Sequence, residues 1–88
     1  MENVDDEFYE RADAHIHLAN DQITEETPRG KVSASFMYGM SRFCCFVTAM
    51  NCEDKEDLVK SKEDSIEYFL EQFKLVLEEN YDDYVDNY

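Results

Sequence analysis

The chain has 88 residues and a formal net charge of −14, from 22 acidic and 8 basic residues. A chain this short forms one domain over residues 1–88, because it cannot build two separate cores. Hydrophobic residues make up 43% and aromatic residues 14% of the chain, enough for a core and too many for a disordered acidic chain. The negative charge disfavours direct binding to nucleic acid and to anionic membrane surfaces.

The N-terminal residues and the uncharged runs argue against export and membrane insertion. The longest uncharged runs, such as 32–41, fall far short of the roughly 20 apolar residues that span a bilayer. Residues 1–7 are acidic, whereas a secretory leader begins with basic and then apolar residues. We therefore expect a cytoplasmic protein without membrane contact, in which a reducing environment keeps the three cysteines as thiols.

The first predicted helix covers residues 5–24. Its apolar residues recur at steps of three or four, as an amphipathic helix requires: Val4, Phe8, Ala12, Ile16, Ala19 and Ile23. Thr27 can cap the next helix, and Pro28 suits its first position because the missing N–H would be unpaired there anyway. The connection is short, which favours antiparallel neighbours.

The second predicted helix covers residues 28–52 and is apolar or small on nearly every side. Its bulky side chains share one face: Val32, Phe36, Met40, Phe43, Val47 and Met50. Its opposite face carries small side chains: Ala34, Ser41, Cys45, Ala49 and Cys52. Arg42 is the only charged residue between Lys31 and Glu53. We therefore predict that this helix is central and enclosed and that its cysteines are buried.

The third predicted helix covers residues 61–84, with Ser61 and Asp64 spaced as a capping box. Its apolar stripe runs at steps of three and four along one face: Ile66, Leu70, Phe73, Leu77, Tyr81 and Tyr84. Tyr68 and Leu75 form a second apolar strip that points away from this stripe. No segment alternates as a strand would. The sequence thus predicts an all-α antiparallel three-helix bundle of long helices around the central apolar helix.

Charge is divided unevenly along the chain. Residues 1–27 carry one basic and nine acidic side chains, and residues 53–88 carry four basic and thirteen acidic ones. Residues 28–52 carry three basic side chains and no acidic one. The apolar middle of the chain is therefore also its only segment with a positive balance.

His15, Cys44 and Cys45 are the candidates for chemistry. His15 lies on the apolar face of the first predicted helix, where we favour a hydrogen-bonded core histidine over a proton-transfer group. His17 is expected to face solvent, and two histidines at this spacing point away from each other and cannot share a metal. The sequence contains no nucleophile, phosphate-loop or zinc-helix motif. We predict no catalytic residue, no metal and no cofactor.

Three hypotheses for the function follow from these features. The leading one is a non-catalytic structural or protein-interaction module that self-associates, because the apolar surface exceeds what one bundle can cover. The expected partner is a second copy in a homodimer, with an interface drawn from Ala34, Ser41, Cys45, Ala49, Tyr68 and Leu75. The alternatives are a small-molecule or enzymatic site between helices near His15 and the cysteines, and an acidic mimic of nucleic acid that binds a protein with a basic surface.

Three segments carry a resemblance to a known family: Arg11 to Asn20 (RADAHIHLAN), Lys31 to Phe43 (KVSASFMYGMSRF) and Ile66 to Tyr84 (IEYFLEQFKLVLEENYDDY). Together they are similar to a family of small bacterial proteins, the domain of unknown function numbered 3144. The resemblance covers nearly the whole chain. It implies a bacterial source and a stand-alone helical domain, and the family has no established activity to transfer.

Overall fold

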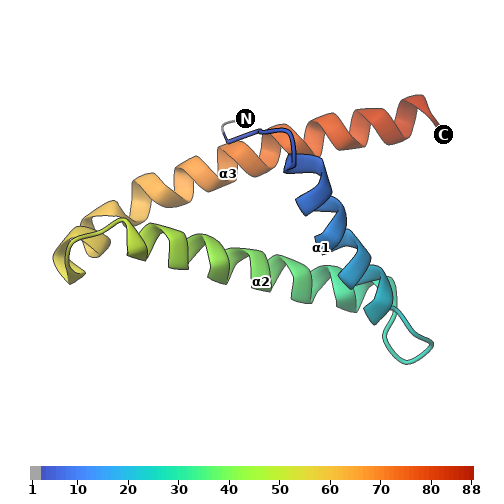
Figure 1. Ribbon diagram of the computed structural model, residues 1–88, viewed down its shortest axis with the longest axis horizontal. Helices are drawn as coiled ribbons and strands as arrows, with labels where there is room; N and C mark the ends of the chain where they lie inside the picture. Colours follow the sequence, from blue (N-terminus) through green and yellow to red (C-terminus); the bar gives the residue numbers. More distant parts are fainter. Residues whose placement is uncertain (1–2) are drawn as a thin grey trace. The chain divides into compact units, whose positions relative to one another are not determined.

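The computed structural model describes residues 3–88 and contains three α-helices (Figure 1). Helix α1 spans Phe8–Gln22, α2 spans Arg29–Met50 and α3 spans Lys55–Asp86. Residues 3–88 contain no β-strand. The structure thus confirms the predicted all-α class with three helices.

The chain divides into two compact units, and the boundary falls inside α2. The unit that ends at Cys45 holds α1 and most of α2. The unit that begins at Phe46 holds the end of α2, the connection to α3 and α3 itself. The assignment of residues 1–88 to one domain stays a prediction. Each unit is described by itself below.

In the unit that ends at Cys45, α1 stops two residues earlier than predicted. Ile23 has extended backbone angles, and its N–H bonds to the carbonyl of Asn20 at 3.1 Å. The backbones of Thr24 and Thr27 then exchange two hydrogen bonds, of 3.0 and 3.3 Å, that close a tight turn. The Ile23 bond pairs one carbonyl that the helix end would otherwise leave unpaired, and the turn then carries the chain away from the helix after Gln22.

Helix α2 begins at Arg29, one residue after the predicted start. The carbonyl of Pro28 accepts hydrogen bonds from the N–H groups of Lys31 and Val32, at 3.0 and 3.3 Å. Pro28 therefore lies just outside the helix and closes its first turn through its carbonyl. A difference of one residue is within the ordinary ambiguity of helix ends.

In the unit that begins at Phe46, α3 starts at Lys55, six residues before the predicted position. Asp54 caps the helix, because its carboxylate accepts from the backbone N–H of Asp57 at 2.9 Å. The Asp57 carboxylate in turn accepts from the N–H of Glu53 at 3.3 Å. The capping box predicted at Ser61 is wrong: the Ser61 hydroxyl donates to the carbonyl of Leu58 at 3.0 Å, inside the helix.

The far end of α3 extends two residues past the predicted limit of Tyr84. Asn87 ends the helix, and its side-chain amide donates to the carbonyl of Asp83 at 2.8 Å. At 32 residues α3 is roughly 48 Å long, compared with roughly 36 Å for the predicted range 61–84.

The burial of side chains in both units differs from the prediction that the second helix is enclosed. Val32, with 4% of its surface exposed, is the only buried side chain among residues 3–88. The other α2 side chains are exposed, except for Cys44 and Thr48, which are half-buried. Phe43, for example, is 64% exposed. The prediction that α2 is enclosed is therefore wrong. Apolar spacing identified the helix correctly, but it did not identify what covers it.

Helix α3 has a half-buried side that is not its apolar stripe. This packed side consists of Ser61, Ser65, Phe69, Gln72 and Val76, again at steps of three and four. Near its start the Ser61 hydroxyl lies 3.9 Å from the sulfur of Cys52, which is also half-buried. Ser61 is small, so Cys52 can approach α3 closely at this point. The stripe that was predicted to face the core is exposed instead.

Candidate functional site

His15 is the first candidate residue, and the structure places it at the surface. Its ring meets that of Phe36 edge to face, with centroids 6.5 Å apart and planes at 62°. The interpretation of His15 as a buried core histidine is therefore wrong, because the side chain is exposed. His17 is exposed, as predicted.

The cysteines differ in exposure and in acidity. Cys45 is exposed, whereas Cys44 and Cys52 are half-buried, so the prediction of three buried thiols is wrong. Burial raises the pKa of the Cys44 thiol above its usual value, and the neighbouring Cys45 raises it further by repulsion between thiolates. A raised pKa keeps Cys44 protonated at neutral pH and makes it a weak nucleophile.

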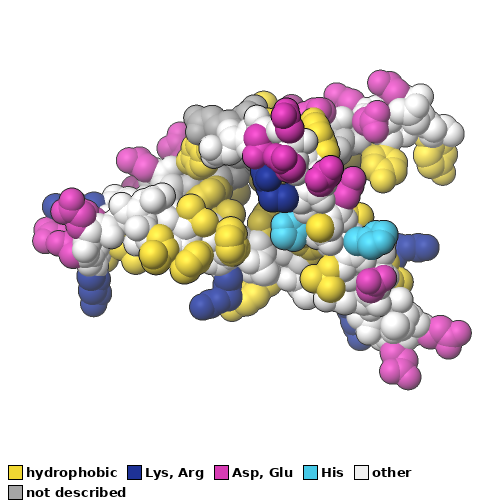
Figure 2. Space-filling model, in the orientation of Figure 1, with side chains coloured by type: hydrophobic (Ala, Val, Ile, Leu, Met, Phe, Trp, Pro, Cys, Tyr) yellow, Lys and Arg dark blue, Asp and Glu magenta, His cyan; other side chains and the backbone are white. Residues whose placement is uncertain are grey.

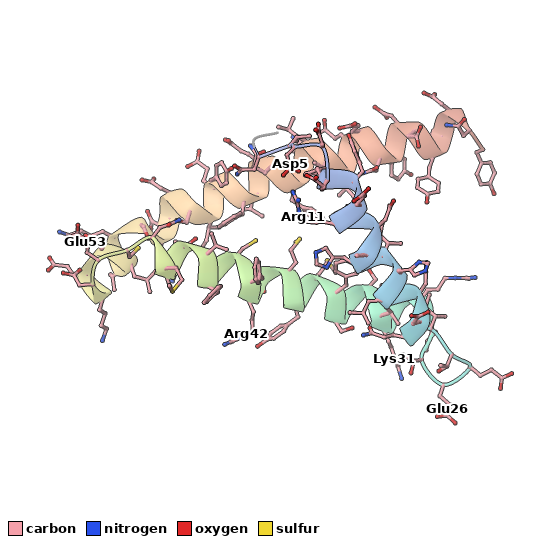
Figure 3. All side chains as sticks on the ribbon, viewed as in Figure 1. Asp5, Arg11, Glu26, Lys31, Arg42 and Glu53 are labelled. Atoms are coloured by element: carbon pink, nitrogen blue, oxygen red, sulfur yellow. The ribbon has the colours of Figure 1, made fainter. Side chains whose placement is uncertain are left out.

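Acidic side chains surround the start of α1. Asp5 and Arg11 form an ion pair with a hydrogen bond of 2.8 Å, and both side chains are more than half exposed (Figure 3). This hydrogen bond lowers the pKa of Asp5. Within residues 3–88, no three histidine, cysteine, aspartate or glutamate side chains are grouped as metal ligands would be. The ion pair joins the segment before α1 to α1 itself, and we assign no chemical role to it.

The six residues that the sequence proposed for an interface are all exposed. Ala34, Ser41, Cys45 and Ala49 share one face of α2, as their spacing requires, and Tyr68 and Leu75 share one face of α3. The Ser41 hydroxyl donates to the carbonyl of Tyr38 at 2.9 Å, so it is satisfied within its own helix. The structure thus leaves these positions accessible, and their place in an interface stays a prediction.

A larger apolar surface lies on the two stripes that the sequence placed in the core. The α2 stripe consists of Phe36, Met40, Phe43, Val47 and Met50, all exposed. The α3 stripe consists of Ile66, Leu70, Phe73, Leu77, Tyr81 and Tyr84, also all exposed. Figure 2 shows hydrophobic side chains at the surface of α2 and of the C-terminal part of α3. Their spacing had already identified the residues, but not their exposure.

Two shallow depressions mark the C-terminal part of the α3 stripe. One, of about 460 Å³, is lined by Leu77, Glu78, Tyr81 and Asp82, and the other, of about 520 Å³, by Tyr81, Tyr84, Val85 and Tyr88. Both lie on α3 and its C-terminal end, so they are notches between neighbouring side chains. Such notches receive side chains of a second helix more readily than they enclose a small ligand.

The two helices that bear the stripes carry opposite charge. Helix α2 has three basic side chains, Arg29, Lys31 and Arg42, and no acidic one. Helix α3 has eleven acidic and four basic side chains. Lys31 and Arg42 extend from α2 in Figure 3. By their spacing, Lys31 and Arg42 lie on a different side of α2 from its stripe, so they do not border that apolar surface.

Comparison with known protein families identifies the family of this helical chain. The model of the family described as "Protein of unknown function (DUF3144)" matches residues 8–85. The chain belongs to the DUF3144 family. This confirms the resemblance inferred from the sequence, and the family description assigns no activity. No curated protein matches the sequence.

A solved structure supports the fold of this DUF3144 chain. The NMR structure of the protein NB7890A from Shewanella sp is 35% identical in sequence and has a TM-score of 0.82. The similarity covers 97% of this chain and 90% of the other. Among residues 3–88, no helix has the length and apolar character needed to cross a membrane. Family membership and fold agree, and neither names a ligand.

Proposed function

We propose that this DUF3144 protein is a non-catalytic helical module that acts by self-association into a homodimer. Support comes from its apolar surface, which includes the α2 stripe and the α3 stripe. Contiguous exposed apolar surface of this kind marks sites of protein interaction. A two-fold homodimer is the commonest way for a chain to cover such a surface.

The accessible surface of the chain, 8242 Å², is the observation that carries the proposal. By the usual scaling with mass, a compact 10.4 kDa monomer exposes about 5,400 Å², and two separate compact bodies of half that mass expose about 6,500 Å² together. The chain therefore exposes roughly 1,700 Å² more than two separate compact units would. This excess is about twice the 800 Å² that each partner buries in a standard interface.

The net charge of −14 on each copy opposes association. At physiological ionic strength this repulsion is screened over about 8 Å, whereas each large apolar side chain that becomes buried contributes roughly 1.5 to 3 kcal/mol. Several such side chains are available on each helix. Apolar burial therefore outweighs the screened repulsion, and association strengthens as salt is added.

Two observations support a bacterial, cytoplasmic setting for the proposed homodimer. The relative of known structure comes from Shewanella sp, and the three cysteines form no disulfide with one another. Thiols are the usual state of cysteines in a reducing compartment.

Light scattering after size exclusion tests the proposal. We expect a mass of twice the 10.4 kDa chain at micromolar concentration in physiological salt, with a larger monomer fraction at low salt. Far-ultraviolet circular dichroism of the same samples checks that the chain is helical throughout. A helical chain whose mass stays at 10.4 kDa across micromolar concentrations would refute self-association.

A further inference from the structure

Three tyrosines share one face at the C-terminal end of α3. Tyr81, Tyr84 and Tyr88 follow one another at steps of three and four residues, and we call them the tyrosine face. Tyr88 lies just past the end of α3, where its N–H bonds to the carbonyl of Val85 at 3.3 Å. All three tyrosines line the same depression of about 520 Å³. The tyrosine face is roughly 10 Å long, at 1.5 Å per residue.

The tyrosine face is open to a partner. Val76 is the last half-buried residue of α3, and residues 77–88 are exposed all round the helix. Tyr81 and Tyr84 are 69% and 76% exposed. Every wall of the depression comes from this one segment of the chain. The rings therefore form a surface that belongs to α3 and its C-terminal end alone.

Carboxylates surround the tyrosine face. Residues 77–88 carry five acidic side chains and no basic one: Glu78, Glu79, Asp82, Asp83 and Asp86. Glu78 and Asp82 line the second depression, of about 460 Å³, together with Tyr81, so they border the rings. Lys74, which precedes this segment, lies 3.8 Å from Glu78 in an exposed ion pair. Such a pair is weak, so most of the negative charge beside the rings is left unbalanced. Figure 2 shows hydrophobic and acidic side chains on this part of α3.

Rings and carboxylates together select the chemistry of the partner. The face of a tyrosine ring attracts a cation, and the planar guanidinium of arginine stacks on the ring and donates two hydrogen bonds to one carboxylate. The net charge of −14 also attracts a basic segment over longer distances. We infer that the tyrosine face docks an arginine-rich segment of another protein, whose side chains enter the two depressions.

The partner is a different protein, because this chain has no arginine-rich segment of its own. Its three arginines are Arg11, Arg29 and Arg42, and the two closest in sequence are 13 residues apart, from 29 to 42. On one helix that separation is roughly 20 Å, about twice the length of the tyrosine face. Arg11 is already paired with Asp5. The inference therefore goes beyond the proposed self-association and does not depend on it.

A peptide of five arginines with blocked ends is the probe. When extended it spans roughly 16 Å, enough to cover the tyrosine face. Fluorescence anisotropy of the labelled peptide measures binding at low salt, where charge attraction is least screened and the proposed dimer is most dissociated. A peptide of five lysines should bind several-fold more weakly, because an ammonium group lacks the planar shape that stacks on a ring and forks onto a carboxylate.

Leucine substitutions separate the effect of the rings from that of net charge. Tyr81→Leu with Tyr84→Leu removes two rings, keeps the net charge at −14 and suits a helix. We expect the five-arginine peptide to bind this variant about tenfold more weakly, which corresponds to about 1.4 kcal/mol. Tyr9→Leu with Tyr38→Leu is the matched control, because these rings are 68% and 65% exposed and lie outside α3. The control, and Tyr81→Phe with Tyr84→Phe, should bind the peptide as the wild type does.

The carboxylates have a matched pair of variants as well. Glu78→Gln with Asp82→Asn neutralises the two side chains that border Tyr81 and changes the net charge from −14 to −12. Glu63→Gln with Asp64→Asn makes the same change in net charge earlier on α3. The first variant should bind the five-arginine peptide several-fold more weakly than the second. Circular dichroism checks that all variants are helical, and this pair decides the question if the leucine variant loses helix.

The outcomes separate this inference from the proposed function. If Tyr81→Leu/Tyr84→Leu binds the peptide as tightly as Tyr9→Leu/Tyr38→Leu, or if five lysines bind as tightly as five arginines, net charge alone attracts the peptide and the inference is wrong. The inference is also wrong if the Tyr81 and Tyr84 variant loses the wild-type dimer in light scattering but keeps its peptide affinity. A monomeric wild type with ring-dependent binding would support the inference and refute self-association.

Discussion

The two sides of α3 contrast in what they bury. The packed side begins with two serines and includes Gln72, yet it is the half-buried side. The α3 stripe carries the larger apolar side chains, among them Leu70 and Leu77, yet it is exposed. The packed side mixes Ser61, Ser65 and Gln72 with Phe69 and Val76, so apolar character alone does not decide which side of α3 is packed. The proposed self-association would use the exposed stripe and leave the packed side in place.

This contrast separates association from folding. If the stripe serves a second chain, changes there should alter the mass of the assembly and leave the helices folded. Changes at buried positions should alter the free energy of unfolding instead. The following predictions test that separation, from the largest expected effect to the smallest.

The double variant Leu70→Glu with Leu77→Glu should abolish the dimer. Each side chain loses roughly 1.5 to 3 kcal/mol of burial, and symmetry repeats the loss in both copies, so dimerisation should weaken by at least about a hundredfold. Sedimentation at micromolar concentration measures the effect. Circular dichroism should show unchanged helix content for the double variant. A dimer that withstands both changes would show that the stripe is not the interface.

Val32 offers the opposite kind of test, because it is the buried residue of the described chain. Val32→Ala should lower the free energy of unfolding by about 2 kcal/mol, through lost burial and the small cavity left behind. Urea unfolding measures this change. Val59→Ala on α3 is the matched control, since Val59 is 66% exposed, and should stay within about 0.5 kcal/mol. Equal effects at the two positions would mean that Val32 is not packed as described.

The positions of the three helices could be predicted from the sequence better than the exposure of their side chains. Spacing at three and four residues predicted three helices and identified both stripes correctly. The start of α3 was missed because two acidic residues, Asp54 and Asp57, form the cap, and Ser61 offered a more familiar pattern. The exposure of His15 and of the stripes was missed for a different reason: periodicity shows that a face is apolar, but not which chain covers it.

The cysteines provide the smallest and most local test. Cys45 should react with a thiol reagent faster than Cys44 between neutral pH and the ordinary thiol range, because it is exposed and burial raises the pKa of Cys44. The difference should narrow as pH rises through the raised pKa of Cys44. Cys45→Ala and Cys44→Ala variants assign the two rates. Equal rates at neutral pH would contradict the described burial.

The most direct measurement of the proposed self-association is an isotope-filtered NOE experiment on mixed labelled and unlabelled chains. It detects only contacts between copies. A homodimer that uses the α3 stripe should give NOEs from the methyl groups of Leu70 and Leu77 in one copy to side chains of the other. Helical chains that show no NOE from those methyl groups to the other copy, at concentrations where the dimer should form, would contradict the account.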